Sequence, residues 1–291
     1  MQIIKHNIFI LGNLIFIICL TCLLGFVRLS KNSTRDTGKS SDSLHIKWER
    51  NKLTIWGDNL RGKKINIDYL EAFCKTGSTN RLWDETKIPH KTEMILTDHN
   101  NQHIRLKTIV QPDIEIIHDI RARKDEVEFN LVLHNKGAKD IDVDWFQPCI
   151  SVDQFTGRNQ ENYISRCFIF TGSGLTTLDK TRRSEEALYK GGQTYIPPGI
   201  NLNDVNPRPI SPDQPANGLI GCFSDDNKYL MATAWDNYQE LFQGIFVCIH
   251  SDPRIGGLKA GEVKKLMGKI YVIENDPKQL LQRYHRDFPL K

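Results

Sequence analysis

Several short motifs that identify common enzyme classes are missing from this sequence. No Gly-x-Gly-x-x-Gly, P-loop, Gly-x-Ser-x-Gly or His-Glu-x-x-His stretch occurs in the 291 residues. Each of these motifs places particular side chains where they hold a phosphate, activate a serine or bind zinc. Their absence argues against nucleotide binding, α/β-hydrolase chemistry and a zinc-protease site.

An excess of charge of one sign is also missing. The 39 basic residues nearly balance the 35 acidic residues. Leaving out residues 1–29 removes two basic residues, Lys5 and Arg28, so that 37 basic residues face 35 acidic ones and the net charge is +2. Proteins that bind nucleic acid need a basic surface, and this composition therefore predicts no nucleic-acid partner.

Cysteine is sparse beyond residue 29, and no two cysteines there form a Cys-x-x-Cys pair. The five are Cys74, Cys149, Cys167, Cys222 and Cys248. An odd, widely spaced set indicates neither a disulfide framework nor a zinc site, although a single disulfide stays open. Cys149, Cys222 and Cys248 lie in apolar runs, where we expect small buried side chains. No metal ligand and no cofactor is predicted.

The most informative stretch is the uninterrupted apolar run from Ile8 to Val27, which carries no charge. Twenty helical residues at about 1.5 Å each span about 30 Å, the thickness of the hydrocarbon core of a bilayer. We therefore expect residues 1–29 to form an uncleaved transmembrane signal anchor. A cleaved signal peptide is the alternative, but only Gly25 near the end of the run is small enough for a cleavage site.

Two arguments about the side of the membrane oppose each other. Lys5 precedes the run, and more basic residues follow it: Arg28, Lys31, Arg35 and Lys39. The positive-inside rule favours a cytoplasmic domain, whereas a short basic start before an apolar run is the usual export signal. We expect a membrane-anchored, extracytoplasmic domain, or a secreted one if the signal is cleaved. Residues 30–43 are too polar to bury and predict a flexible linker.

Beyond residue 43, apolar and polar residues alternate with the period of two that is typical of β-strands. The alternation predicts strands at residues 44–48, 52–56, 64–73, 92–97, 103–110, 114–121, 127–133, 141–146, 164–170, 219–223, 229–235, 244–250 and 269–274. Asp276 and Pro277 provide a cap and a first-turn proline for one helix over residues 278–285. So many strands beside one confident helix predict an all-β fold, a large antiparallel β-sandwich (supersandwich-like) with a short C-terminal helix.

One long stretch, at about residues 171–215, interrupts the strand pattern and is rich in proline and glycine. Irregular connections of this length are uncommon in a compact domain and are usually functional or disordered. We expect the stretch to form a loop over one face of the sandwich. Residues 44–291 would then be a single β-sandwich domain with a loop insertion.

Residues 128–153 resemble the core hairpin of galactose-mutarotase-like sandwiches, the fold of aldose epimerases and of domains in many polysaccharide-active enzymes. In that family an alternating strand ends in Asn-x-Gly, and its return strand ends in a polar-Pro-aromatic motif. The corresponding pieces here are Asn135-Lys136-Gly137 and Gln147-Pro148-Cys149, and Ala260-Gly261-Glu262 looks like the family's Pro-Gly-Glu turn. The resemblance implies a carbohydrate ligand.

This chain departs from the family at the position that matters for catalysis. Epimerases of this type place a catalytic histidine in a His-Pro-Tyr-like motif, where this chain has Gln147. Mutarotase activity itself is therefore not implied. Residues 71–74 and 83–90 also resemble segments of uncharacterised exported bacterial proteins, a resemblance that implies no known reaction.

The densest polar cluster lies at residues 77–93. It contains Arg81, Trp83, Asp84, Glu85 and His90. A sugar site needs an aromatic face for the C–H side of the ring and charged groups for its hydroxyls, and two carboxyls with different pKa values can act as acid and base. The alternative is a solvated loop with Trp83 packed into the core.

Three further places carry candidate ligand contacts. Trp145 and Gln147 are two residues apart and therefore share one face of a strand. Arg158 follows them in a loop, where it either contacts a ligand or pairs with Asp153. Trp235 ends a strand and either forms a second aromatic platform or packs in the core.

His250 and Asp252 form the last candidate pair. A histidine at a strand end with a carboxylate two residues on can act as a base and its orienting group. The same residues also suit a turn that Asp252-Pro253 begins. Together with His90 and Glu93 they could instead bind a metal, although His90-x-x-Glu93 by itself is a weak signal.

The sequence therefore predicts a membrane-tethered or exported protein that recognises carbohydrate. If it is an enzyme, a question left open, its acid–base residues are expected to be His90, Glu85, Asp84 and His250. The expected substrate contacts are Trp83, Arg81, Trp145, Gln147, Arg158 and Trp235. Two alternatives remain: a non-catalytic envelope module that binds glycan or protein, and a metal-dependent hydrolase. The oligomeric state stays open.

Overall fold

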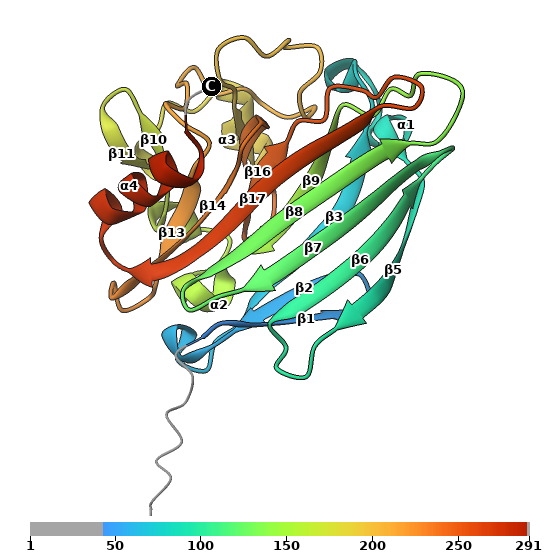
Figure 1. Cartoon of the computed structure of the whole chain (residues 1–291). Coiled ribbons are helices and arrows are strands. Elements are labelled where there is room, and N and C mark those ends of the chain that lie inside the picture. The colour runs from blue at the N-terminus through green and yellow to red at the C-terminus, as the bar shows by residue number, and fades with distance from the viewer. Residues whose placement is uncertain (1–42, 290–291) are drawn as a thin grey trace, which may run out of the picture. The chain divides into compact units, whose positions relative to one another are not determined.

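The computed structural model describes residues 43–289, and two antiparallel sheets make up this body (Figure 1). The predicted anchor at residues 1–29 and residues 30–42 of the predicted linker lie outside the described residues. None of the helices within residues 43–289 is long and apolar enough to cross a membrane.

The first sheet, called sheet A here, has eight strands. Its order is β1 (His45–Glu49), β2 (Lys52–Trp56), β3 (Ile65–Cys74), β9 (Trp145–Ser151), β16 (Cys248–Pro253), β15 (Tyr238–Gln243) and β12 (Gln193–Tyr195), with β4 (Lys87–Ile88) paired to β3. Strands that are distant in sequence therefore lie next to each other at its centre.

The second sheet, sheet B, has nine strands and lies across sheet A (Figure 1). Its order is β11 (Gly174–Thr177), β10 (Cys167–Thr171), β13 (Ile220–Phe223), β14 (Tyr229–Trp235), β17 (Val263–Glu274), β8 (Glu126–Asn135), β7 (Ile114–Ala122), β6 (His103–Val110) and β5 (His90–Thr97). The α-helices are α1 (Trp83–Thr86), α2 (Asp153–Thr156), α3 (Glu185–Lys190) and α4 (Pro277–Asp287), and single 3₁₀ turns lie at Asp58–Leu60, Ser78–Asn80, Tyr163–Ser165 and Leu178–Lys180.

The main core lies between the two sheets, and the period-two pattern explains it. Alternate residues of β8 are buried, as predicted from the sequence: Val127, Phe129, Leu131 and Leu133. They pack in one apolar cluster with inward residues of sheet A such as Phe73, Phe146 and Ile249. The predicted antiparallel β-sandwich with a short C-terminal helix is therefore confirmed for the described body.

The predicted hairpin of residues 128–153 is wrong. β8 lies in sheet B and β9 in sheet A, so the chain crosses between the sheets instead of returning beside β8. Within the connection, the Asp144 N–H donates to the Cys74 carbonyl of sheet A. The expected strand at residues 141–146 is reduced to a single bridge at Ile141, and β9 begins only at Trp145.

Two further strand predictions need correction. The expected strand at residues 244–250 contains a turn, because β15 ends at Gln243 and β16 begins at Cys248. His250 to Pro253 continue β16 and do not form the turn that the Asp-Pro pair suggested. The insertion at residues 171–215 is also more regular than expected, since it contains β11, α3 and β12.

Helix α4 covers the outer face of sheet B at the end that holds β10, β13 and β14 (Figure 1). Asp276 caps it by accepting hydrogen bonds from the N–H groups of Lys278 and Gln279, with Pro277 in the first turn. Leu280, Tyr284 and Phe288 pack on apolar residues of the sheet. The predicted capping signal and the helix that it begins are therefore confirmed.

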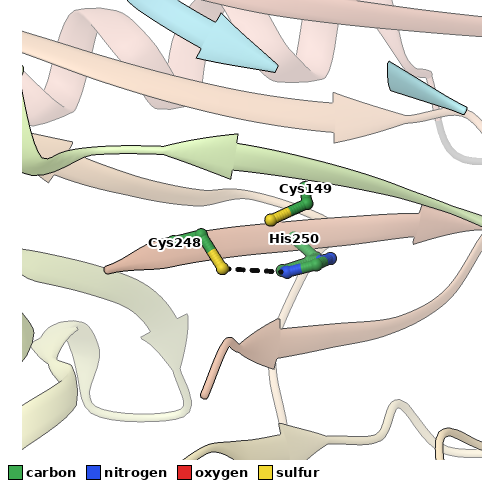
Figure 2. A group of neighbouring side chains, drawn as sticks. All are labelled: Cys149, Cys248 and His250. Carbon is green, nitrogen blue, oxygen red and sulfur yellow. Dashed lines mark hydrogen bonds between the residues drawn. The ribbon is translucent and has the colours of Figure 1, made fainter. Parts of the chain in front are cut away.

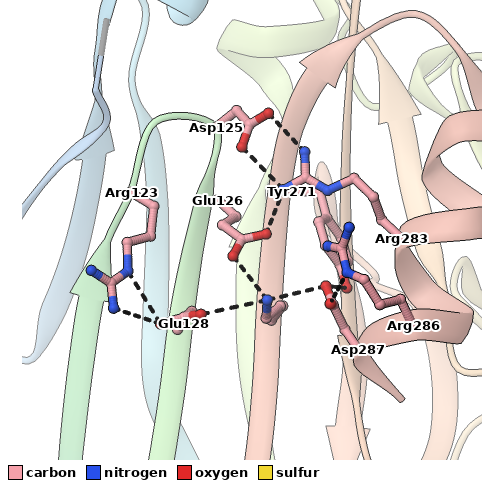
Figure 3. Close-up of polar contacts among 9 residues, drawn as sticks. Arg123, Asp125, Glu126, Glu128, Tyr271, Arg283, Arg286 and Asp287 are labelled. Carbon is pink, nitrogen blue, oxygen red and sulfur yellow. Dashed lines mark hydrogen bonds and ion pairs between the residues drawn. The ribbon is translucent and has the colours of Figure 1, made fainter. Parts of the chain in front are cut away.

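A partly buried network of charges joins α4 to the sheet (Figure 3). Lys269 of β17 pairs with Glu126 at 2.8 Å, Asp287 at 3.0 Å and Glu128 at 3.5 Å, and its side chain is only 9% exposed. Arg283 of α4 pairs with Asp125 at 2.7 Å and with Glu126. Arg286 also pairs with Asp287, and Arg123 pairs with Glu128. Four carboxylates thus share four cations in a partly buried network.

Lys269→Ala is expected to lower the free energy of unfolding by about 2 kcal/mol or more, because three partly buried carboxylates would each lose one of their cations. Each keeps one other partner: Arg283 for Glu126, Arg286 for Asp287 and Arg123 for Glu128. Urea unfolding of both proteins measures the change. Lys47→Ala is the control: its ion pair with Glu49 has both side chains 59% exposed, and water screens such a pair, so its loss should change the stability far less. Equal, small losses in both variants would contradict the role given to Lys269.

Candidate functional site

Groups that can bind a ligand gather on the outer face of sheet A, the face turned away from sheet B. A pocket of about 250 Å³ lies there. It is lined by Glu71, Trp83, Gln147, Cys149, Asn206, Arg208, Phe242, Gly244, Ile245, Phe246, Cys248 and His250. We call this the outer-face pocket. Four larger hollows, of about 400 to 590 Å³, lie elsewhere on the described residues. None of them combines an indole ring with side-chain amides, a carboxylate and a guanidinium.

The two central strands of sheet A build the floor of the pocket by alternation. On β9, Phe146 and Ile150 point into the main core, so that Gln147 and Cys149 point outward. On β16, Ile249 points inward, while Cys248 and His250 point outward. Ile249 pairs with Ile150 across the two strands, which brings the outward residues of both strands together.

A chain of hydrogen bonds crosses the floor of the pocket. Gln147 donates from Nε2 to Glu71 at 2.8 Å and accepts at Oε1 from the Asn206 side chain at 2.9 Å. The backbone N–H of Asn206 lies 3.1 Å from both carboxyl oxygens of Glu240. Residues from β3, β9, β15 and the segment 196–219 are thereby locked in one arrangement.

The segment 196–219 covers part of the outer face because further hydrogen bonds hold it there. The carbonyl of Asp204 accepts from the Ser78 hydroxyl at 2.7 Å and from the Gln239 side chain at 3.0 Å. The carboxylate of Asp204 accepts from the Gly77 N–H at 2.7 Å. Trp145 lies beneath this contact and donates its indole N–H to the Ser78 hydroxyl.

Three carboxyl groups are buried under this cover, and burial raises the pKa of each. Burial raises the pKa of Glu240 to about 8, although the hydrogen bond from the Asn206 N–H opposes the shift; the nearby Asp144 charge adds a smaller increase. Burial raises the pKa of Asp144 to about 6, although Arg254, 3.6 Å away, opposes the shift. Burial, followed by the charges of Glu240 and Glu71, also raises the pKa of Asp252.

His250 lies between a thiol and a carboxyl group. Its Nε2 is 3.3 Å from the Cys248 sulfur, and its Nδ1 is 3.7 Å from Oδ1 of Asp252. Cys149 reaches the same place from β9, as Figure 2 shows. A hydrogen bond with Cys248, together with burial, raises the pKa of the Cys149 thiol.

The structure brings three of the predicted site residues to the outer-face pocket: Trp83, Gln147 and His250. Trp145 is fully buried and packs against Trp83, with ring centroids 6.4 Å apart. Trp145 therefore supports the pocket without lining it.

The other predicted residues lie elsewhere. Asp84 and His90 line a neighbouring hollow that shares Glu71 with the pocket. Asp84 is paired with Lys87 at 2.6 Å, and burial lowers the pKa of His90. Three residues, Arg81, Glu85 and Arg158, are exposed outside the pocket lining. Trp235 packs in the main core between Phe129 and Phe146.

Sequence reasoning did not assign several of the lining residues, namely Glu71, Asn206, Arg208, Phe242 and the two cysteines Cys149 and Cys248. Cys248, His250 and Asp252 are each two residues apart, a spacing that in a strand places all three side chains on one face and could have indicated a site. The others come from segments far apart in sequence, and no local pattern joins them.

The chain was compared with protein families, curated proteins and solved structures. No protein-family model matches the chain, and no curated protein matches it. Similar structures include a putative aldose 1-epimerase from Escherichia coli K12, with 10% identity, a TM-score of 0.43 and coverage of 79% of this chain and 99% of that one. A galactose mutarotase-like protein from Lactobacillus casei has 9% identity, a TM-score of 0.42 and coverage of 79% and 99%.

An alpha-N-acetylgalactosaminidase from Bifidobacterium bifidum also matches, with 8% identity and a TM-score of 0.48 over 84% of this chain and 37% of that one. The similar structures thus include aldose epimerases, a mutarotase-like protein and a glycosidase, the kinds of protein that residues 128–153 resemble. Likeness at this level does not show what this chain binds or does.

Glu240→Gln is expected to reduce the loss of stability that the protein suffers as pH rises. The carboxyl group ionises near 4.5 in the unfolded chain but only near 8 when folded. Between these values the folded state holds the extra proton, so the free energy of unfolding falls as pH increases. Glutamine has no proton to lose. Urea unfolding measures the free energy of unfolding of both proteins at about pH 5 and about pH 9. The fall between the two pH values should be larger in the unmodified protein by more than about 1.4 kcal/mol, the equivalent of one pKa unit. Equal falls in both proteins would contradict the buried, neutral carboxyl group.

Proposed function

We propose that this protein binds a carbohydrate ligand of about one sugar ring in the outer-face pocket. The observation that supports the proposal is the meeting of an indole ring, two side-chain amides, a carboxylate and a guanidinium in one hollow: Trp83, Gln147, Asn206, Glu71 and Arg208. An aromatic wall suits the C–H face of a sugar, and convergent polar groups suit its hydroxyls.

The polar groups suit hydroxyls in particular because a hydroxyl both donates and accepts a hydrogen bond. The Gln147 amide is held on one side by Glu71 and on the other by Asn206. Its remaining N–H and lone pair therefore point in fixed directions before a ligand arrives. Fixing them in advance reduces the entropy that binding would otherwise lose.

The size of the pocket limits the ligand. Its volume of about 250 Å³ lies just below the range of about 300–1,000 Å³ that is usual for drug-sized ligands. A single ring fits this space better than an oligosaccharide does.

The proposal concerns recognition, not a reaction. Of the four residues predicted to be catalytic, His250 alone lines the pocket. The position where the epimerase family has a histidine holds Gln147, whose side chain has no titratable proton. A binding module is therefore favoured over an acid–base enzyme.

We also propose that residues 1–29 anchor this binding module at a membrane and that residues 30–43 link the anchor to it. The apolar run Ile8–Val27 supports the anchor, and the export-like start supports an extracytoplasmic module. Cell fractionation tests this proposal. Full-length protein should sediment with membranes and resist alkaline extraction, and release by alkali would contradict the anchor.

Trp83→Ala is expected to weaken binding of the preferred sugar about tenfold, which corresponds to about 1.4 kcal/mol, because one wall of the pocket is lost. A panel of monosaccharides is first screened for thermal stabilisation, since a ligand of the folded state raises the melting temperature. Calorimetry with the best sugar then gives the affinity of each variant.

Trp56→Ala is the matched control for this experiment. Trp56 stacks on His45 at the edge of sheet A and does not line the pocket. Its variant should bind as the unmodified protein does. Equal weakening in both variants, or no stabilisation by any sugar in the panel, would contradict the proposal.

A further inference from the structure

Three side chains with metal-binding atoms converge on the floor of the outer-face pocket (Figure 2). Cys248 and His250 are two residues apart on β16, and Cys149 reaches them from the neighbouring strand β9. The two sulfur atoms and one ring nitrogen all lie within 4.8 Å of one another. In the part of the chain that the structure describes, no other group of three His, Cys, Asp or Glu side chains is arranged so that it could hold a metal ion.

We propose that Cys149, Cys248 and His250 bind a divalent transition metal, with zinc as the ion that best suits their chemistry. Two thiolates and one imidazole are ligands that zinc prefers, with Zn–S distances of about 2.3 Å and Zn–N distances of about 2.0–2.1 Å. A tetrahedron with these bond lengths separates its ligand atoms by about 3.5–3.8 Å. Cys248 and His250, 3.3 Å apart, are already near that separation, so closure requires a side-chain movement of about 1 Å.

A second observation points to the same ligand. The side chain of His250 is 2% exposed and that of Asp252 is 0% exposed, yet Nδ1 of His250 and both carboxyl oxygens of Asp252 have no hydrogen-bond partner. Buried polar atoms without partners are rare because they are costly. Histidines that bind a metal through one nitrogen almost always donate the other N–H to a carboxylate, carbonyl or water. A metal on Nε2 of His250 would put the proton on Nδ1, directed at Asp252.

The backbone next to the Cys248 thiol leaves no room for a side chain at residue 244. A Cβ atom at Gly244 would lie 2.1 Å from the Cys248 sulfur, so only glycine leaves room for this thiol. The charges balance as well, because two thiolates neutralise a divalent cation and the complex can be buried without net charge.

This ligand set differs from the metal site considered from the sequence. That site combined His90 and Glu93 with His250 and Asp252, but β5 and β16 belong to different sheets, and only His250 of the four has its donor atom in the cluster. Because all three proposed ligands line the pocket, a bound metal would keep one coordination position facing the pocket. The metal site rests on its own geometry and does not depend on the carbohydrate proposal.

Cobalt(II) is the probe for the test, because thiolate ligation gives it intense charge-transfer absorption and tetrahedral geometry gives it strong d–d bands. Full-length protein is reduced, treated with a chelator, freed of both reagents and titrated with Co²⁺. We expect one equivalent to bind with both signatures and Zn²⁺ to displace it. Cys149→Ala, Cys248→Ala and His250→Ala should each weaken binding at least about 100-fold, since each removes one of three ligands.

Two further variants separate the proposal from a general effect on folding. Asp252→Asn should weaken Co²⁺ binding about 10- to 100-fold and keep the tetrahedral spectrum, as expected for a group that orients a ligand. Cys222→Ala removes a buried thiol of β13, at the position opposite Cys167 of β10. This variant should bind Co²⁺ as the unmodified protein does. Loss of the signal in Cys222→Ala, or its retention in Cys248→Ala, would overturn the assignment.

X-ray absorption of the zinc-loaded unmodified protein keeps the test decisive if the ligand variants fail to fold. Two sulfur neighbours and one imidazole are expected around the zinc ion. A different sulfur count, binding below one equivalent, or a Cys149–Cys248 disulfide that persists in protein purified without reductant would overturn the proposal. Carbohydrate binding is measured in a separate experiment, so a negative result for the metal site does not contradict the carbohydrate proposal, and the reverse also holds.

Discussion

The outer-face pocket depends on the hydrogen bonds that hold residues 196–219 against sheet A. Glu240 accepts from the backbone of Asn206, and Gln147 accepts from its side chain. Without these contacts water would reach the outward residues of β15 and β16, and the buried carboxyl groups would ionise at neutral pH. The depth of the pocket, the raised pKa of Glu240 and the fixed orientation of Gln147 therefore have one common cause.

The sequence predicts the inner half of the sandwich well and its outer half poorly. β8 alternates cleanly because one of its faces meets the core and the other is partly exposed. β15 is buried on both faces, yet its sequence is polar enough to be typical of a loop. Its buried polar residues include Gln239, Glu240 and Gln243. No periodicity rule identifies a strand in which so many of the buried side chains are polar, since polarity normally marks exposure to water.

The candidate site shows the same division. The sequence predicts Trp83, Gln147 and His250 as site residues because aromatic, amide and imidazole side chains often contact ligands. Glu71 and Asn206 are missed because their importance comes from meeting Gln147, 76 and 59 residues away in sequence. Contacts of this kind arise because strands that are far apart in sequence, β3, β9 and β16, lie side by side at the centre of sheet A. Composition alone does not show which strands become neighbours.

The most direct measurement records the indole N–H signals of the five tryptophans by NMR while a stabilising monosaccharide is added. The five residues lie in different surroundings: Trp48, Trp56, Trp83, Trp145 and Trp235. Binding in the outer-face pocket predicts the largest shift for Trp83 and a smaller one for Trp145, which packs against it. The signals of Trp48, Trp56 and Trp235 should not move. A shift at Trp48 or Trp56 while Trp83 stays unchanged would contradict the account.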